Sequence, residues 1–331
     1  MTSPGAPDVV VVGGGIVGCA TAAFLAADDA RVTLVEQAEV AFGASGRNSG
    51  VVQQPFDPAL VGLYRRSLEL YRDLAAELPS AFRLGGEPSG LLLVGPAAAE
   101  REAAALVAAW AAGYPETRPE LIAGAELVAL EPGLASDLAA CRVGIGFPVA
   151  PASATHAYAT LAERLGARVA VGEAAALAVD GDRVTGVIVD GRLVPAGSVV
   201  VAAGPWTPQV IAPGGDWPPI GRSWGVVAAM ALDEPPHHVL EEIDIDIEPG
   251  DLATDGGGDE PAPDAGFGFS LVTAGGSSAL GSTFLAERPE EADVLDRLRE
   301  RGARYVPAIA TARVTGMRTC ARPVTPDGRP L

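Results

Sequence analysis

A run of four valines at residues 9–12 leads directly into the glycine-rich segment GGGIVG at residues 13–18. The valines are typical of a short buried strand, and residues 16–27 are rich in small helix formers. Residues 31–36 (RVTLVE) then return to a strand pattern. These three segments have the order and length of a βαβ unit, so the sequence predicts an α/β fold with parallel strands at its N-terminal end.

The glycines of this unit follow the spacing Gly13-x-Gly15-x-x-Gly18. Gly13 permits a tight turn, Gly15 lets the backbone approach a pyrophosphate, and Gly18 lets helix and strand pack closely. The helix that begins at Ile16 and Val17 directs N–H groups and the positive end of its dipole toward the phosphates. The spacing therefore predicts a dinucleotide site; a glycine turn that serves packing alone is the other interpretation.

Glu36 ends the second strand of the unit, eighteen positions after Gly18, and Gln37 follows it. A carboxylate at this place accepts hydrogen bonds from ribose hydroxyls and repels a 2′-phosphate. We therefore include Glu36 and Gln37 in the cofactor site and expect NAD or FAD as the ligand.

The charge of the chain limits its partners. There are 42 acidic and 23 basic residues, which gives a net charge of −19. Nucleic acids and anionic membranes would be repelled at long range, so we expect a small-molecule partner. All 23 basic residues are arginines, which excludes a Schiff-base lysine and a Walker-type phosphate-binding lysine.

The three cysteines, Cys19, Cys141 and Cys320, are widely spaced and form no CxxC pair. This pattern favours a reducing compartment without disulfides and predicts no metal site. The N-terminal residues lack the basic region of a signal peptide, and no apolar stretch reaches the length of a membrane helix. We therefore expect a cytoplasmic protein without a transmembrane segment.

The rest of the chain alternates between helical and strand patterns. Helices are expected over residues 58–78, 97–112, 119–130, 153–165 and 290–304. Strands are expected within 82–94, as a run of short strands over 167–193, at 198–204, and as a hairpin formed by 267–272 and 278–282. The segment 241–264 contains ten acidic residues and no basic one, and we expect its second half to be a mobile loop and not a calcium site.

A second glycine- and serine-rich segment, GASGRNSG at residues 43–50, bears on which dinucleotide binds. A nicotinamide dehydrogenase usually continues with regular βα units at this point, and it remains the alternative interpretation. A loop with one arginine and several small polar side chains suits the middle of a longer ligand. This feature favours FAD over NAD.

At this segment the chain resembles the D-amino-acid oxidase superfamily of FAD enzymes, which includes glycine oxidase, sarcosine oxidase and D-amino-acid dehydrogenases. The resemblance rests on four stretches in the same order, namely the glycine turn with Glu36, residues 43–50, VVAAGPW at 200–206 and RPVTPDGRP at 322–330. It implies a Rossmann-like FAD-binding domain interleaved with a mostly antiparallel α+β substrate domain. The implied FAD domain comprises residues 1–80, 148–215 and 314–331, and the substrate domain comprises 81–147 and 216–313.

The resemblance also implies an activity and further cofactor contacts. Enzymes of this superfamily transfer a hydride to the flavin from the C–H next to the amine of an amino acid or secondary amine, and the flavin itself performs this step. The further contacts fall on the second and third stretches and on one strand residue that commonly meets the adenine. They are Ser45, Arg47, Asn48, Ser49, Ala203, Gly204 and Val171.

An amino-acid substrate requires a cation for its carboxylate, and arginine provides a planar, bidentate one. The resemblance places this role on Arg322, five positions before Asp327, or on Arg318, which matches an alternative Gly-x-Arg form. The other interpretation is a salt bridge that holds the strand. Cys320 occupies a position similar to that of the flavin-linked cysteine of monomeric sarcosine oxidases, so a covalent link is a further hypothesis.

Five other side chains are considered as site or structural residues. Trp224 and Tyr305 are candidate aromatic residues of a substrate pocket, whereas the pair His237–His238 is expected on a loop surface and His156 in a structural role on a helix.

The sequence ends at Leu331, whereas members of this superfamily continue with a strand and a glycine-rich loop that opens a last helix facing the flavin. We therefore also consider a chain with impaired FAD retention and no independent activity, and a chain whose missing element is supplied by a partner subunit.

Overall fold

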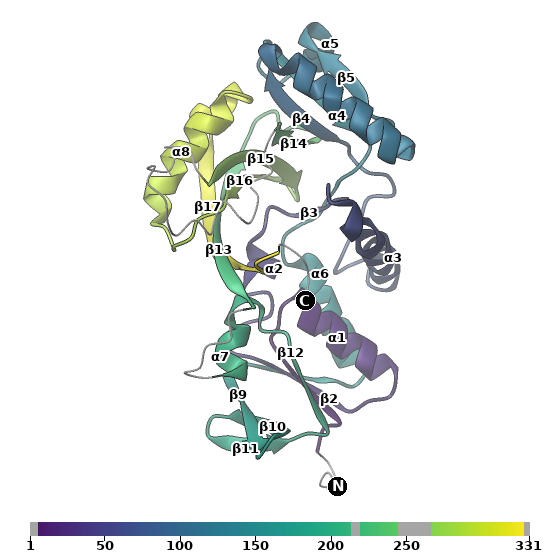
Figure 1. Cartoon of the computed structure of the whole chain (residues 1–331), viewed down its shortest axis with the longest axis vertical. Helices are drawn as coiled ribbons and strands as arrows, with labels where there is room; N and C mark the ends of the chain where they lie inside the picture. Colours follow the sequence, from purple (N-terminus) through teal and green to yellow (C-terminus); the bar gives the residue numbers. More distant parts are fainter. Residues whose placement is uncertain (1–5, 213–218, 244–265, 328–331) are drawn as a thin grey trace.

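The computed structural model describes residues 6–212, 219–243 and 266–327 (Figure 1). Two main sheets lie one above the other along the long axis of the molecule, and a three-stranded meander lies at the lower end (Figure 1). The lower sheet has four parallel strands and the upper sheet has eight strands of mixed direction. This arrangement is the α/β architecture predicted from the sequence.

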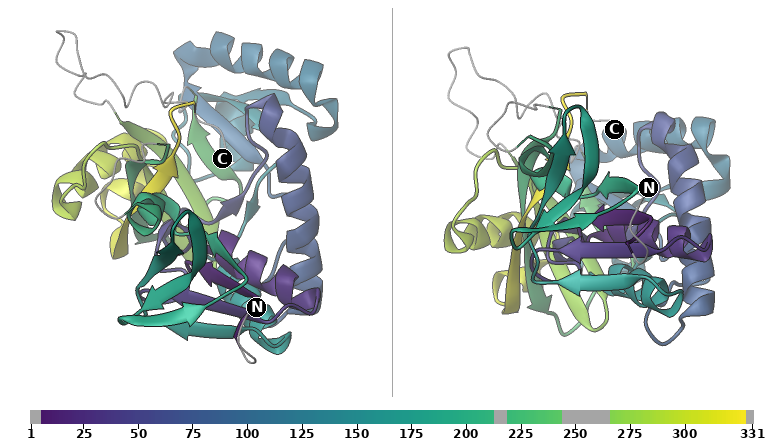
Figure 2. Two further views of the ribbon diagram at one scale, coloured as in Figure 1. Left: turned by 60° about the horizontal axis from the view of Figure 1, so that its bottom comes forward. Right: turned by 90° about the horizontal axis from the view of Figure 1, so that it is seen from below.

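The parallel sheet has the strand order β12-β1-β2-β8. Its strands are β1 (Val9–Val12), β2 (Val32–Glu36), β8 (Arg168–Val171) and β12 (Ser198–Val201). Helices α1 (Ile16–Ala27) and α6 (Ser153–Arg164) cover one face, and their buried alanines allow the helices to approach each other closely. The other face is covered by the meander of β9 (Ala175–Asp180), β10 (Arg183–Val189) and β11 (Arg192–Pro195), as both views in Figure 2 show.

The continuous valine run in β1 follows from this layering. Val11 packs under α1, whereas Val10 and Val12 pack against the meander residues Val187 and Val189. A strand that is buried on both faces has apolar residues at every position, without the alternation of a half-exposed strand.

The upper sheet has the order β17-β13-β16-β15-β14-β4-β6-β5. Its strands are β4 (Leu91–Pro96), β5 (Glu120–Ala123), β6 (Leu138–Val143), β13 (Gly221–Ala231), β14 (Val239–Glu242), β15 (Phe267–Ala274), β16 (Ser277–Thr283) and β17 (Arg313–Val324). Helices α5 (Gly124–Leu130) and α8 (Glu291–Ala303) pack on one face, and α4 (Glu100–Gly113) packs on the other.

Further helices, short strands and turns complete the described chain. They are α2 (Ala44–Arg47), β3 (Val51–Val52), α3 (Val61–Glu77), β7 (Phe147–Pro148) and α7 (Thr207–Ile211), with 3-10 turns at η1 (Pro58–Leu60), η2 (Ala97–Ala99), η3 (Pro115–Thr117), η4 (Gly204–Trp206) and η6 (Pro307–Ala310). Strands β3 and β7 form a small antiparallel pair of their own.

Most of the expected elements are present, but the helix expected over 119–130 is wrong in its first part. Residues 120–123 form the edge strand β5, which pairs with β6, and the helix begins at Gly124. Pairing with a neighbouring strand outweighs the local helical pattern there. The loop expected in the second half of 241–264 lies outside the described residues, and residues 241–242 belong to β14. Strand β17, which the predicted partition assigns in part to the FAD domain, is hydrogen-bonded to β13 in the upper sheet.

Within the described ranges, no helix is both long and apolar enough to cross a membrane. The same residues contain no group of three or more histidine, cysteine or acidic side chains placed to hold a metal ion.

Candidate active site

A cavity of about 940 Å³ opens where β1, β2 and β12 of the parallel sheet end. Parallel strands place their carboxyl ends at one edge of the sheet, which is where α/β folds bind their ligands. The sequence-predicted residues that line this cavity are Gly13, Gly15, Ile16, Val17, Glu36, Gln37, Ser45, Ala203 and Gly204. Segments far apart in the sequence therefore meet at the site expected for a dinucleotide.

The glycine turn is built as its spacing predicts. Gly13 has a φ of +115°, and a Cβ there would collide with the carbonyl oxygen of Ala202 in the segment after β12. A Cβ at Gly18 would collide with the carbonyl oxygen of Gly13. Only glycine, which has no Cβ, fits at both positions without a clash. The glycine segment and the first turn of α1 therefore remain close to the edge of the sheet.

Two polar side chains hold the glycine turn in place. The carboxylate of Glu36 accepts a hydrogen bond from the N–H of Gly14 at 2.6 Å and one from Ala38 at 2.9 Å. The hydroxyl of Ser45 accepts the N–H of Ile16 at 3.0 Å, at the start of α1. Both side chains line the cavity, so the same groups that shape the turn are available to a ligand.

Five predicted cofactor residues lie outside this lining, and one of them, Gly18, is buried in α1 behind the turn. Val171 is 51% exposed and lies opposite Glu36 in the pairing of β8 with β2. Arg47 stacks on the ring of Phe42 and donates to the carbonyl of Thr319 at 3.1 Å.

The other two residues shape the segment that follows α2. The amide of Asn48 donates to the carbonyls of Ala44 and Ser45, and its oxygen accepts the N–H of Gly50. Ser49 faces β16, with its hydroxyl 3.6 Å from the place of a Cβ at Gly281. The roles of Arg47, Asn48, Ser49 and Val171 at the cofactor therefore remain predictions.

The cavity also contains residues that were not predicted to contact the cofactor. They include Glu173, Ala175, Trp206, Thr207, Val210 and residues 323–325 at the end of β17. Trp206 lies 3.4 Å from the place of a Cβ at Gly43 and forms part of the wall. Trp206 and residues 323–325 lie in two of the stretches that carry the family resemblance, whereas Glu173, Ala175, Thr207 and Val210 lie in no motif and reach the site only through tertiary packing.

Arg322 is partly buried on β17, directly before the cavity residues 323–325. It donates to the carbonyl of Thr283 at 2.6 Å, and its guanidinium lies 4.8 Å from the ring centre of Phe284. Burial lowers the pKa of the Arg322 guanidinium. Among the residues that the structure describes, no carboxylate pairs with Arg322, which argues against a salt bridge that holds the strand.

Arg318 lies on the same strand face, four positions earlier. It donates to the carbonyl of Asn48 at 3.2 Å, and its Nε is buried without a hydrogen-bond partner in the described chain. Arg318 lines a separate cavity of about 410 Å³ together with Arg47, His156 and Glu291. Of the two candidate arginines, Arg322 is therefore the one that adjoins the lining of the dinucleotide cavity.

The comparison with known protein families agrees with this geometry. The family model described as DAO, FAD dependent oxidoreductase, matches residues 8–331. The chain belongs to this family. FAD is therefore the cofactor, in place of the NAD alternative.

Individual relatives of this DAO-family chain are distant. It is 28% identical over 307 residues to the uncharacterized oxidoreductase YurR of Bacillus subtilis, which covers 86% of this chain and 79% of that protein. The structure of glycine oxidase from Geobacillus kaustophilus matches 98% of this chain and 84% of its own, with a TM-score of 0.79 and 24% identity. L-proline dehydrogenase from P. horikoshii matches 99% and 84%, with a TM-score of 0.78 and 20% identity. These two similarities confirm the fold.

The residues around the large cavity fit FAD. The first turn of α1 provides N–H groups for a pyrophosphate, and Glu36 and Glu173 provide carboxylates suited to an unphosphorylated ribose. The lining is mainly apolar toward Trp206, Val210 and residues 323–325, as a flat ring system requires.

The structure does not favour a reactive thiolate at Cys320. Burial raises the pKa of the Cys320 thiol, and the nearby charges of Arg47, Arg322 and Arg288 offset this rise only in part. A thiol must ionise to act as a nucleophile, so the covalent flavin link has no support from this environment.

Trp224 and Tyr305 lie away from the face that carries Arg322. Trp224 alternates with Ser223 and Gly225 along β13, and these two residues lie opposite Arg322 and Cys320 on β17. Tyr305 stacks on Phe269 at 4.6 Å and donates to Glu242 on the α8 side of the sheet. Neither aromatic residue is placed as the sequence hypothesis required.

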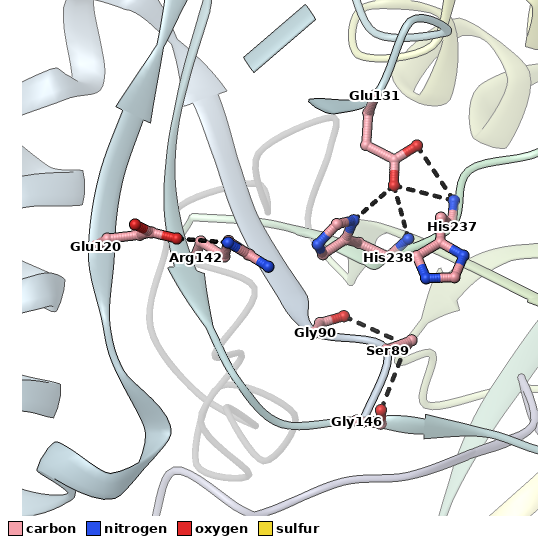
Figure 3. A network of polar contacts seen from close by, with 8 residues as sticks. All are labelled: Ser89, Gly90, Glu120, Glu131, Arg142, Gly146, His237 and His238. Carbon is pink, nitrogen blue, oxygen red and sulfur yellow. Dashed lines mark hydrogen bonds and ion pairs between the residues drawn. The ribbon is translucent and has the colours of Figure 1, made fainter. Parts of the chain in front are cut away.

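The prediction of a surface position is wrong for His238, which is only 4% exposed; Figure 3 shows its ring beside Glu131. Its Nδ1 lies 2.6 Å from the carboxylate of Glu131, which also accepts the backbone N–H groups of His237 and His238. Burial acts to raise the pKa of Glu131, but these hydrogen bonds together lower it. The contact between Glu131 and His238 connects the end of α5 to the start of β14. The local sequence around either residue does not predict it.

Proposed function

We propose that this chain oxidises an amine or an amino acid at the carbon next to its nitrogen. FAD, when bound, supplies the acceptor for the hydride that leaves this carbon. The names of the structural neighbours, glycine oxidase and L-proline dehydrogenase, describe reactions of this class in those proteins. Their similarity supports the proposal at the level of the fold.

The observation that carries the proposal is the environment of Arg322. A partly buried guanidinium normally pairs with a carboxylate, because an unpaired charge loses hydration without compensation. Arg322 instead meets a carbonyl, a phenyl ring and the backbone of Gly225. The hydroxyl of Ser223, opposite Arg322 in the sheet, is also buried without a hydrogen-bond partner in the described residues. A substrate carboxylate would satisfy these donors.

The roles of the protein groups follow from this placement. Arg322 binds and orients the carboxylate of an amino acid, and the carbonyl of Thr283 fixes the guanidinium in its plane. The phenyl ring of Phe284 limits the access of water to the ion pair. Because residues 323–325 line the cofactor cavity, a carboxylate held by Arg322 lies beside the end of the bound dinucleotide.

The test begins with the visible spectrum of the purified protein, which we expect to be yellow or to become so when FAD is added. Anaerobic mixing with an amino acid and with the amine that lacks its carboxylate then measures flavin reduction. We expect Arg322→Ala to raise KM for the amino acid at least tenfold and to leave the simple amine nearly unchanged. Arg304→Ala, an exposed arginine at the end of α8, is the matched control. An equal rise in KM for the amino acid and the simple amine would show that Arg322 does not bind the substrate carboxylate.

The proposal also includes the cellular compartment, the domain boundaries and a partner subunit. The described cysteines are unpaired, which supports a reducing, cytoplasmic compartment. We also propose an FAD domain of residues 1–80, 148–215 and 314–331 and a substrate domain of residues 81–147 and 216–313, with β17 hydrogen-bonded to the upper sheet. A partner subunit next to the flavin is tested by the mass of the native protein: an active monomer would exclude it.

A further inference from the structure

The cavity of about 410 Å³ that Arg318 lines, which we term the second cavity, lies apart from the dinucleotide cavity. It forms where α2 contacts both β17 and α6, and the start of α8 contributes Glu291 to its lining (Figure 1). Phe42 is the residue that the two linings share. The second cavity is therefore a neighbour of the cofactor site and not a part of it.

Two arginines of the second cavity have no carboxylate partner. Arg318 donates to the carbonyl of Asn48 at 3.2 Å, and its buried Nε has no hydrogen-bond partner among the described residues. Arg47 donates to the carbonyl of Thr319 at 3.1 Å and stacks on Phe42. Within the described ranges, no carboxylate forms an ion pair with either guanidinium. Buried donors are nearly always paired, so these arginines indicate an acceptor that the chain itself does not supply.

The start of α6 also favours a negative group in this cavity. Ala152 lines the cavity and occupies the N-cap position of α6, where its side chain forms no capping hydrogen bond. The first turn of α6 contains no acidic residue. The positive end of the helix dipole therefore adds to the charge of the two arginines.

Two glutamates bring negative charge to the same lining. Glu291, the first residue of α8, accepts a hydrogen bond from the hydroxyl of Thr319 at 2.7 Å, and Glu39 is exposed. Both carboxylates would repel a dianion such as phosphate, whereas they would attract an ammonium group. The lining therefore favours a ligand that carries one carboxylate and one ammonium group.

Thr319 sets the distance between the opposite charges. Its backbone carbonyl accepts Nη1 of Arg47, and its hydroxyl donates to Oε1 of Glu291. Because both contacts belong to one residue, Nη1 and Oε1 lie within about 10 Å of each other, and since they form no ion pair they lie more than about 4 Å apart. The carboxylate and the amine of an α-amino acid, with a hydrogen bond of about 3 Å at each end, span roughly 9 Å. An α-amino acid thus fits between the two groups.

We propose that the second cavity binds an α-amino acid with an apolar side chain, at a site separate from the flavin. The carboxylate of this ligand pairs with Arg318 and Arg47, and its ammonium group binds Glu291. Val40 and Met317, which also line the cavity, contact its side chain. The residues of the second cavity have no part in the proposed function, so the two proposals stand independently.

Anaerobic calorimetry with the purified protein tests the site, with leucine as the probe. The titrations use Arg322→Ala, because this change removes the residue proposed to bind a carboxylate beside the flavin. Leucine is compared with 4-methylpentanoate, which lacks the amine, and with 3-methylbutylamine, which lacks the carboxylate. We expect leucine to bind at least tenfold more tightly than either. An equal affinity for leucine and 4-methylpentanoate, or no binding of leucine, would overturn the proposal.

A second change in this variant tests the positive end of the site. Arg318→Met removes the guanidinium and keeps a long side chain, so we expect it to weaken leucine and 4-methylpentanoate at least tenfold each. Arg313→Met, at an exposed position at the start of β17, is the matched control and should change neither affinity. Leucine binding that Arg318→Met leaves unchanged would refute the site.

Glu291→Gln tests the negative end and also decides the question if Arg318→Met does not fold. Its amide oxygen can still accept the hydroxyl of Thr319, so the variant removes the charge and keeps the contact. We expect it to weaken leucine at least fivefold and to leave 4-methylpentanoate within twofold, a difference that a merely structural role would not produce. Glu290→Gln, at the exposed neighbouring position, should change neither affinity. Equal weakening of both ligands by Glu291→Gln, or of neither, would overturn the ammonium contact. Flavin reduction is not measured in these titrations, so their failure leaves the proposed function intact.

Discussion

The guanidinium of Arg322 occupies the space in which any side chain at position 225 would lie. A Cβ at Gly225 would be 2.5 Å from Nη2 and 2.6 Å from Cζ of Arg322. Gly225 has no left-handed backbone requirement, so its role is to leave room for the guanidinium. The orientation of Arg322, the residue proposed to bind the substrate carboxylate, thus depends on the absence of a side chain at Gly225 on the neighbouring strand.

Replacing Gly225 with alanine should displace Arg322 without removing its charge. We expect Gly225→Ala to raise KM for amino-acid substrates at least tenfold, because the guanidinium loses its alignment. Gly316→Ala, on β17 with open space around its Cβ, should leave KM unchanged. Steady-state kinetics of both variants check this expectation, and unaltered kinetics in Gly225→Ala would contradict it.

Gly13→Ala should impair FAD binding. The new Cβ would collide with the carbonyl oxygen of Ala202, and the φ of +115° is unfavourable for alanine by about 1–3 kcal/mol. We expect FAD affinity to fall at least tenfold in a titration of the apoprotein. Gly62→Ala, inside α3 with open space, should retain FAD affinity and stabilise the protein by up to about 1 kcal/mol.

The buried pair of Glu131 and His238 should contribute to stability in a pH-dependent manner. Glu131→Gln should lower the free energy of unfolding near pH 7 by about 2–3 kcal/mol, because three donors lose a charged acceptor. Urea unfolding measures this change. Glu120→Gln, in the exposed pair with Arg142 in Figure 3, should cost less than about 1 kcal/mol.

The sign of the pH effect follows from the lowered pKa of Glu131. A carboxyl group whose pKa falls on folding stabilises the protein above its ordinary pKa of 4.5, and this contribution is lost as the pH falls through the folded value. The difference between wild type and Glu131→Gln should therefore shrink between pH 7 and about pH 3. A difference that stays constant over this range would show that Glu131 acts through its shape alone.

The flavin should be released when the protein is denatured with acid. The raised pKa of the Cys320 thiol disfavours the thiolate that a covalent bond would require. We expect the yellow colour in the supernatant after precipitation and unchanged retention of FAD in Cys320→Ser. Colour that remains in the wild-type pellet and disappears from that of Cys320→Ser would establish the covalent link.

The dinucleotide turn could be predicted from the sequence because its requirements are local. The steric need for glycine at Gly13 and Gly18 and the position of Glu36 involve residues within one βαβ unit. The Arg-Pro-x-x-x-Asp-Gly spacing likewise singled out Arg322, which lies directly before the cavity residues 323–325.

Other features depended on contacts between distant residues. Local periodicity predicted a helix at 120–123, where pairing with β6 produces a strand. His238 follows two prolines and resembles a surface loop, yet a carboxylate 107 positions away draws it into the interior. Gln53 and Glu241 are separated by 188 positions. The order of amino acids is enough to define the cofactor turn, whereas the packed chain sets which charges are buried and which polar groups are paired, because desolvation and hydrogen bonding depend on neighbours in space.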